Sequence, residues 1–277
     1  MLEWAASASD APYVFVLVHG FSDLAHAWQP VAQRLAAHGR VVAPDLRGHG
    51  DSDWIGGGGY YHFLDYIADL DEVIARCAGG DAAKVVVVGH SMGGSVSAYW
   101  AGMRPSKLHA LVLIEGLGPP DASHTDVAAR MTSWLDAWRG ARAKARVMAS
   151  VDEAAQRLRR YDAMLDDAEA RRLAAVGTQA LDGGGVVWKL DPLHHTMGPY
   201  PFRLDVAQSF WRRVTCPVLC IDGADSRMNL AGDERARRRA CFASARDVTV
   251  AGAGHAVPRH APDAVARLIV DHATSAP

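Results

Sequence analysis

The first half of the chain alternates between short apolar runs and amphipathic stretches, and this alternation limits the possible fold more than any other feature. Tyr13–Val18 is an uninterrupted β-branched and aromatic run, as expected for a strand buried on both faces. Residues 63–77 carry apolar side chains at spacings of three and four, which predicts a helix. Further strands are predicted at 40–43, 85–88, 111–114, 217–221 and 246–250, and further helices at 28–38, 95–103, 233–242 and 262–272. Strands and helices in strict turn predict a parallel sheet with right-handed crossovers.

The alternation stops at Gly118-Pro119-Pro120 and resumes near Asp205. No strand of comparable strength is predicted between these points. Instead there are two helical stripes, formed by Val127, Met131, Trp134, Leu135 and Trp138 and by Ala154, Leu158, Tyr161 and Leu165. We therefore expect residues 1–118 and 206–277 to form an α/β core, and residues 119–205 to form a helical insert.

The charge of the chain is nearly balanced, with 29 basic and 31 acidic residues and a formal net charge of −2. No net field attracts nucleic acid or an anionic membrane, and no apolar run is long enough to span a bilayer. Residues 1–9 lack the basic and apolar stretches of a signal peptide, and the four cysteines are scattered. These features predict a cytoplasmic protein with no nucleic-acid or membrane partner.

Gly89-His90-Ser91-Met92-Gly93-Gly94 follows the four-valine strand directly and leads into a predicted helix. This G-x-S-x-G arrangement between a strand and a helix is a nucleophile elbow. The turn is so tight that side chains at Gly89 and Gly93 would collide with neighbouring backbone. The sequence therefore predicts that the Ser91 hydroxyl is exposed at the carboxyl edge of the sheet.

His19-Gly20-Phe21 follows the first strong strand and is expected to turn toward this elbow. The backbone N–H groups of Phe21 and Met92 are candidates for an oxyanion hole, the pair of donors that acyl transfer requires. We expect His19 to support this loop rather than to act as a base.

A histidine base for Ser91 is expected on a loop after the last strand, where Ala251-Gly252-Ala253-Gly254-His255 fits. The small residues around His255 let its imidazole approach the serine. His194 and His195, beside Asp191, suggest a metal at first sight. Adjacent histidines diverge, however, and no third ligand has suitable spacing, so we expect no metal there and a solvated or pocket-rim position for the pair.

These motifs resemble the α/β-hydrolase superfamily over essentially the whole chain. The matching pieces are HGF at 19–21, PDLRGHGDSD at 44–53, GHSMGG at 89–94 and GAGH at 252–255. LVLIEGLGPP at 111–120 and the DPLHH stretch are similar to the serine-hydrolase-like branch of lid-bearing esterases. The resemblance implies a mostly parallel sheet with helices on both faces, a Ser–His–acid triad, and a helical cap inserted after the strand that follows the elbow. Its first strands are expected to be shortened or absent, because only 18 residues precede His19.

The resemblance leaves two positions for the acid. The commonest is the fourth residue of a G-x-x-D loop after the penultimate strand, but here that position holds Ser226, and Asp225 lies one place early. The second is the end of the strand that follows the elbow, used by haloalkane dehalogenases with a glutamate acid, and here it holds Glu115. A carboxylate beside a buried strand needs a partner, which a histidine that becomes cationic would supply. We favour Glu115 over Asp225.

The identity of the nucleophile limits the classes of reaction that this site can catalyse. A serine with a histidine base suits attack on an acyl carbonyl, whereas dehalogenases and epoxide hydrolases of this fold use an aspartate. We expect hydrolysis of a carboxylic ester or thioester of a small, fairly apolar substrate through an acyl-enzyme, without a cofactor, by a monomer or homodimer. The alternatives are a cofactor-free lyase, oxygenase or acyltransferase on the same fold, or a non-catalytic ligand-binding member.

The insert is expected to lie over the carboxyl edge of the sheet and to bind the substrate. Met131, Trp134 and Trp138 are the candidate substrate-binding residues, and Met148 and Met164 are further candidates for an apolar acyl pocket. The alternative is that these side chains only pack the insert onto the core.

Overall fold

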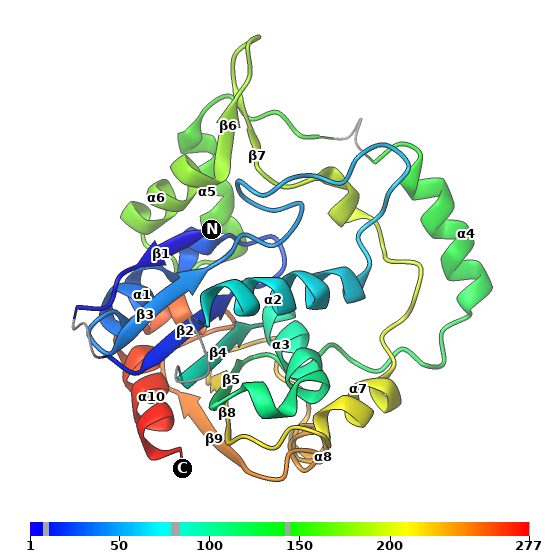
Figure 1. Ribbon diagram of the computed structural model, residues 1–277. Helices are drawn as coiled ribbons and strands as arrows, with labels where there is room; N and C mark the ends of the chain where they lie inside the picture. Colours follow the sequence, from blue (N-terminus) through cyan, green and yellow to red (C-terminus); the bar gives the residue numbers. More distant parts are fainter. Residues whose placement is uncertain (8–10, 79–83, 142–144, 277) are drawn as a thin grey trace.

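Seven strands form one sheet at the centre of the molecule, in the order β1-β3-β2-β4-β5-β8-β9 (Figure 1). The computed structural model describes residues 1–7, 11–78, 84–141 and 145–276. β1 runs antiparallel to β3, and every other neighbouring pair is parallel. The strands are β1 (Leu2–Trp4), β2 (Tyr13–Val18), β3 (Gly39–Ala43), β4 (Lys84–His90), β5 (Ala110–Ile114), β8 (Val218–Gly223) and β9 (Ala245–Val250). The predicted α/β-hydrolase architecture, a mostly parallel sheet with helices on both faces, is confirmed.

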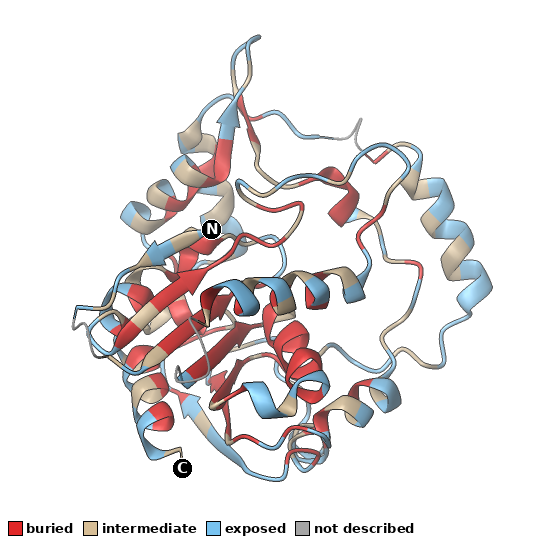
Figure 2. Ribbon diagram, in the orientation of Figure 1, coloured by how far each residue is buried: buried red, intermediate tan, exposed pale blue. Residues whose placement is uncertain are grey.

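Two apolar cores lie on opposite faces of this sheet. Val14, Val16 and Val18 of β2 face one core, whereas Phe15 and Leu17 face the other. The first core is covered by α2 (Phe63–Cys77), α3 (Met92–Met103) and α7 (Leu204–Trp211), and the second by α1 (Gln29–Leu35) and α10 (Pro262–Ser275). Because both faces are covered, the central strands are buried along their length (Figure 2), which explains their unbroken apolar sequences.

The helix predicted at residues 63–77 is confirmed at both ends, while other predicted elements differ at their boundaries. The helix predicted at 28–38 begins as a 3₁₀ turn, η1 (Ala25–Trp28), and α1 ends at Leu35. The remaining core elements are η2 (Pro105–Lys107), α8 (Gly232–Arg239) and α9 (Val257–His260). Within the described residues, no helix combines the length and apolar character needed to cross a bilayer.

Residues 119–205, hereafter the inserted segment, leave the sheet after β5 and return at α7. They contain α4 (Val127–Trp138), α5 (Val151–Tyr161), α6 (Asp167–Gly177), β6 (Thr178–Ala180), β7 (Val186–Trp188) and η4 (Pro192–His195). β6 and β7 form a two-stranded antiparallel ribbon that the sequence did not predict. Each strand has three residues, which is too short for a periodic pattern to stand out.

One arginine of α8 holds both ends of the inserted segment. The buried guanidinium of Arg238 donates hydrogen bonds to the carbonyl oxygens of Leu117, Gly118 and Pro119, at 2.8, 3.0 and 2.8 Å. It also lies over the ring of Phe202, 5.7 Å from the centroid. The outgoing and returning chains are therefore fixed to the core at the same place.

Candidate active site

Ser91 lies at the junction of β4 and α3 in a backbone conformation that few residues adopt. Its φ is 51° and its ψ is −118°, and its N–H donates to the carbonyl of Ile114 at 2.9 Å. A Cβ on Gly89 would lie 2.4 Å from the carbonyl oxygen of Gly93, and a Cβ on Gly93 would lie 2.3 Å from that of Val18. The predicted backbone collisions at both glycines are confirmed, so the turn that presents Ser91 requires them.

His255 follows β9 and lies between Ser91 and Glu115. Its Nε2 is 3.0 Å from Ser91 Oγ, and its Nδ1 is 3.2 Å from Glu115 Oε2. A carboxylate only accepts hydrogen bonds, so Nδ1 carries the proton and Nε2 is left to accept from the serine hydroxyl. The arrangement gives a serine, a base and an orienting carboxylate in one hydrogen-bonded chain.

Glu115 is held by more than the histidine. It directly follows β5 with a φ of 52°, and its side chain is 3% exposed. Oε1 accepts from the Gly223 N–H at 2.8 Å, and Oε2 accepts from Ser226 Oγ at 2.9 Å. Two donors besides His255 offset the cost of burying this carboxylate and fix its direction.

Asp225, the other candidate acid, has an exposed side chain. Its backbone N–H donates to the carbonyl of Ala253 at 2.9 Å, but across the described residues its carboxylate makes no hydrogen bond to His255. Ser226 was not predicted to take part in the site. The sequence signal for Ser226 is that it stands at the position where an acid is common. In the structure its hydroxyl donates to Glu115.

The loop after β2 lies against the elbow, as the motif HGF suggested. A Cβ on Gly20 would lie 3.1 Å from Ser91 Cβ, so this backbone approaches the serine closely. Phe21 follows and is 48% exposed, and Met92 is the first residue of α3, where helix N–H groups lack partners within the helix. His19 is buried and accepts from the Leu46 N–H at 2.9 Å, a supporting position.

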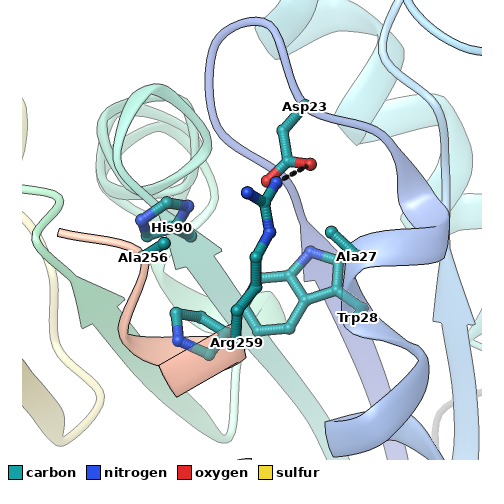
Figure 3. Close-up of a pocket in the computed structure, with 7 residues that line it drawn as sticks. Asp23, Ala27, Trp28, His90, Ala256 and Arg259 are labelled. Atoms are coloured by element: carbon teal, nitrogen blue, oxygen red, sulfur yellow. Dashed lines mark ion pairs between the residues drawn. The ribbon is translucent and has the colours of Figure 1, made fainter. Parts of the chain in front are cut away.

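His90, beside the serine, contacts the loop that carries His255. Its Nε2–H donates to the His255 carbonyl at 2.8 Å. Burial, reinforced by the neighbouring His255, lowers the pKa of His90 to about 4, so the ring is neutral near pH 7. Figure 3 shows this ring across a small pocket from Arg259, which reaches from α9 to pair with Asp23. The same short helix therefore binds the loop after β2.

His194 and His195 have different environments. His195 is exposed, in agreement with the expected solvated position, but that prediction is wrong for His194, which is buried. Its ring stacks on Tyr61 with centroids 4.0 Å apart, and its Nε2 is 2.8 Å from Tyr66 Oη. Burial lowers the pKa of His194 to about 4. Stacking and hydrogen bonding allow a neutral imidazole to be buried, which spacing alone did not reveal.

The candidate substrate-binding residues all lie on α4 and are half-buried. Trp134 contacts Tyr60 edge-on at 5.2 Å between centroids and stacks on Trp138 at 5.9 Å, and Met131 lies one turn before it. The described ring contacts of this group join Trp134 to Tyr60 and Trp138, and none of them involves His255.

Met148 and Met164, the two further candidates, differ in exposure. Met148 is 1% exposed and packs among the residues of the inserted segment, so the expectation that it lines a substrate pocket is wrong. Met164 is 46% exposed and adjoins the His255 loop, because a Cβ on Gly254 would lie 3.3 Å from its Sδ.

Comparison with known proteins places this geometry in a family. The sequence model described as "Alpha/beta hydrolase family" matches residues 15–268. The chain belongs to this family. Among solved structures, the thioesterase domain from the curacin biosynthetic pathway has a TM-score of 0.84 and 29% identity, covering 97% of this chain and 93% of that one. A Mycobacterium tuberculosis esterase has a TM-score of 0.73 at 23% identity, covering 94% and 85%, and supports the fold alone.

Similarity to curated proteins is confined to part of each sequence. The 3-hydroxybutyrate-oligomer hydrolase of Cupriavidus necator is 34% identical over 117 residues, 42% of this chain and 38% of that protein. The acetyltransferase component of the acetoin cleaving system of Pseudomonas putida is 37% identical over 126 residues, which are 44% of this chain and 32% of that protein. The chain thus spans about a third of the length of these relatives. Together, the family match and the similarity to the thioesterase domain support a hydrolase.

Proposed function

We propose that this protein is a serine hydrolase that cleaves a carboxylic ester or thioester of a small, fairly apolar substrate through an acyl-enzyme. The observation that carries the proposal is the hydrogen-bonded chain from Ser91 Oγ through His255 to Glu115, with links of 3.0 and 3.2 Å. This order of hydroxyl, imidazole and carboxylate is what general-base activation of a serine requires.

Acylation begins when Ser91 Oγ attacks the acyl carbon and His255 Nε2 takes its proton. The imidazolium that forms is stabilised by Glu115, whose carboxylate accepts the Nδ1–H and is oriented by Gly223 N–H and Ser226 Oγ. The Nε2 proton then passes to the leaving alcohol or thiol as the bond to the acyl carbon breaks.

Deacylation repeats these steps with water as the nucleophile. His255 takes a proton from water, the hydroxide adds to the acyl carbon, and Ser91 Oγ leaves with the proton returned by the imidazolium. In both halves the negative carbonyl oxygen is assigned to the N–H groups of Phe21 and Met92. The closeness of the Gly20 backbone to Ser91 and the N-terminus of α3 support that assignment.

The substrate class is inferred from the site and from the similar proteins. A thioesterase domain and a 3-hydroxybutyrate-oligomer hydrolase act on acyl carbonyls by their names, which favours the carboxylic-ester hydrolase class for this chain. We assign residues 119–205 as a cap over the site and Met131, Trp134 and Trp138 as its apolar substrate contacts. The half-buried indoles on α4 support this role.

A fluorophosphonate probe tests the nucleophile. We expect labelling of the wild type at neutral pH, with the adduct located on Ser91 by peptide mass mapping, and none for Ser91→Ala. The variant is expected to fold normally, since alanine adds no bulk to the elbow, and to lose at least about 10³-fold in kcat. An unlabelled, folded wild type would remove the nucleophile from the proposal.

A matched pair of amide substitutions tests the acid. Glu115→Gln removes the charge that stabilises the imidazolium, and we expect kcat to fall by about 10²- to 10⁴-fold. Asp225→Asn changes an exposed side chain, and we expect kcat within about twofold of the wild type. The reverse order of effects would transfer the acid role to Asp225.

A further inference from the structure

His260, the last residue of α9, links the loop that carries His255 to the inserted segment. Its Nδ1 accepts from the Gly254 N–H at 3.0 Å, and its Nε2 lies 2.9 and 3.0 Å from the two carboxylate oxygens of Asp162. Both side chains are nearly buried, with 4% of His260 and 13% of Asp162 exposed. The contact joins residues 98 apart in the sequence.

The proton positions in this link are determined by its partners. The Gly254 N–H is always a donor, so His260 Nδ1 must accept and the ring proton lies on Nε2, where it donates to Asp162. Burial raises the pKa of Asp162, but the hydrogen bonds from His260 and the Met164 N–H and the nearby charge of Arg259 outweigh it, so the pKa is lowered overall and the carboxylate is ionised. The result is a continuous chain from a carboxylate at the end of α5 to the peptide before His255.

In the described part of the chain, three hydrogen bonds hold the backbone of residues 252–255, which form the His255 loop. Asp225 N–H donates to the Ala253 carbonyl, Gly254 N–H donates to His260, and His90 donates to the His255 carbonyl. Of these, the bond to His260 is the one that continues into the inserted segment. Since a misplacement of about 1 Å can cost about 10²-fold in rate, the position of this loop matters for the His255 imidazole.

We propose that His260 and Asp162 are positioning residues that hold the backbone of the His255 loop, so that its imidazole stays between Glu115 and Ser91. The proposal rests on the proposed serine hydrolase function. It assigns the end of α5 a part in catalysis, although neither residue touches the reacting atoms.

Two substitutions at His260 separate its two hydrogen bonds. His260→Asn places an oxygen near Nδ1 and retains an acceptor for Gly254, whereas His260→Gln places an amide near Nε2 and leaves Gly254 without that acceptor. We expect His260→Gln to slow Ser91 labelling and to lower kcat by about 10- to 100-fold with KM within twofold, and His260→Asn to stay within about fivefold. Asp162→Asn weakens the link, and we expect it to lower the rate of Ser91 labelling and kcat by about three- to tenfold.

Asp152→Asn is the matched control, because Asp152 is an exposed carboxylate on the same helix whose ion pair with Arg171 stays inside the inserted segment. We expect Asp152→Asn to match the wild type in the rate of Ser91 labelling and in kcat. A second readout is the low-field ¹H NMR signal of His255 Nδ1–H, assigned by its loss in Glu115→Gln. It should broaden or disappear in His260→Gln and persist in Asp152→Asn.

The outcomes distinguish this inference from the function on which it rests. A labelled wild type together with folded His260→Gln and Asp162→Asn variants that react at wild-type rates would overturn the positioning role alone. If His260→Gln does not fold, Asp162→Asn decides by the same criterion. An unlabelled wild type would overturn the serine hydrolase proposal and this inference with it.

Discussion

The helices α4, α5 and α6 divide the inserted segment before residue 189 into two halves that are packed in different ways. The α5–α6 half (residues 145–188) has its own apolar core, formed by Met148, Ala154, Ala155, Leu165, Ala170, Leu173, Ala174 and Val186 together with Ala27 of η1. The α4 half (residues 119–141) has no fully buried residue on its helix. Figure 2 shows the contrast, with buried positions on α5 and α6 and only intermediate or exposed ones on α4.

Hydrogen bonds to the core also differ between the α5–α6 half and the α4 half. Arg172 of α6 donates to the carbonyl of His26 at 3.1 Å and to Gln29 Oε1 at 3.0 Å, and Asp162 pairs with His260. On α4, Arg130 donates to the Gly198 carbonyl at 2.7 Å, which lies within the inserted segment itself. We infer that the α5–α6 half is fixed to the core beside the His255 loop, while the α4 half is packed less tightly.

A matched pair of leucine truncations gives the largest expected difference between the halves. Leu173 of α6 is 2% exposed, so Leu173→Ala should leave a cavity and lower the free energy of unfolding by about 2–5 kcal/mol. Leu135 of α4 is 43% exposed, and Leu135→Ala should cost less than about 1 kcal/mol. Urea unfolding measures the stability of both variants, and equal losses would contradict the difference in packing between the halves.

The adjacent histidines of η4, which lie in the returning chain outside both halves, differ in how they respond to pH. Burial lowers the pKa of His194 to about 4, so between pH 6.5 and 4 the unfolded chain binds a proton that the folded chain does not. The free energy of unfolding therefore falls as pH falls through this window, by up to about 3 kcal/mol from this residue. His90 contributes in the same direction.

Substitution of each histidine isolates this effect. Unfolding measured at pH 7 and pH 4.5 should show a smaller pH-dependent loss for His194→Gln than for the wild type. The exposed neighbour His195 supplies the control, and His195→Gln should keep the wild-type dependence. If both variants keep it, the buried imidazole does not titrate as its environment implies.

A substitution on α4 should change substrate binding more than stability. Trp134→Ala removes an indole that contacts Tyr60 and Trp138, and we expect KM for an apolar ester to rise about tenfold, or about 1.4 kcal/mol in kcat/KM. The thermal midpoint should move by only a few degrees. A fall in kcat with unchanged KM would argue against a binding role for this half.

The sequence predicted most of the core, because buried parallel strands and amphipathic helices leave strong patterns. It also selected Ser91, His255 and Glu115, which the structure brings within hydrogen-bonding distance, and their catalytic roles stay a proposal. The β6–β7 ribbon was missed because three-residue strands carry no period. The contacts of Ser226 with Glu115 and of His260 with Asp162 depend on chain packing over 98 to 111 residues, which local patterns do not encode.

In the proposed mechanism, Ser91 carries the acyl group during turnover. Rapid acid quench of the wild type with p-nitrophenyl butyrate, followed by peptide mass mapping, tests it directly. We predict a butyryl group on Ser91 within the first turnover, and in Ser91→Ala neither the adduct nor p-nitrophenol release above background. Release of p-nitrophenol by Ser91→Ala at the wild-type rate, or turnover by the wild type with no acyl group on Ser91, would contradict it.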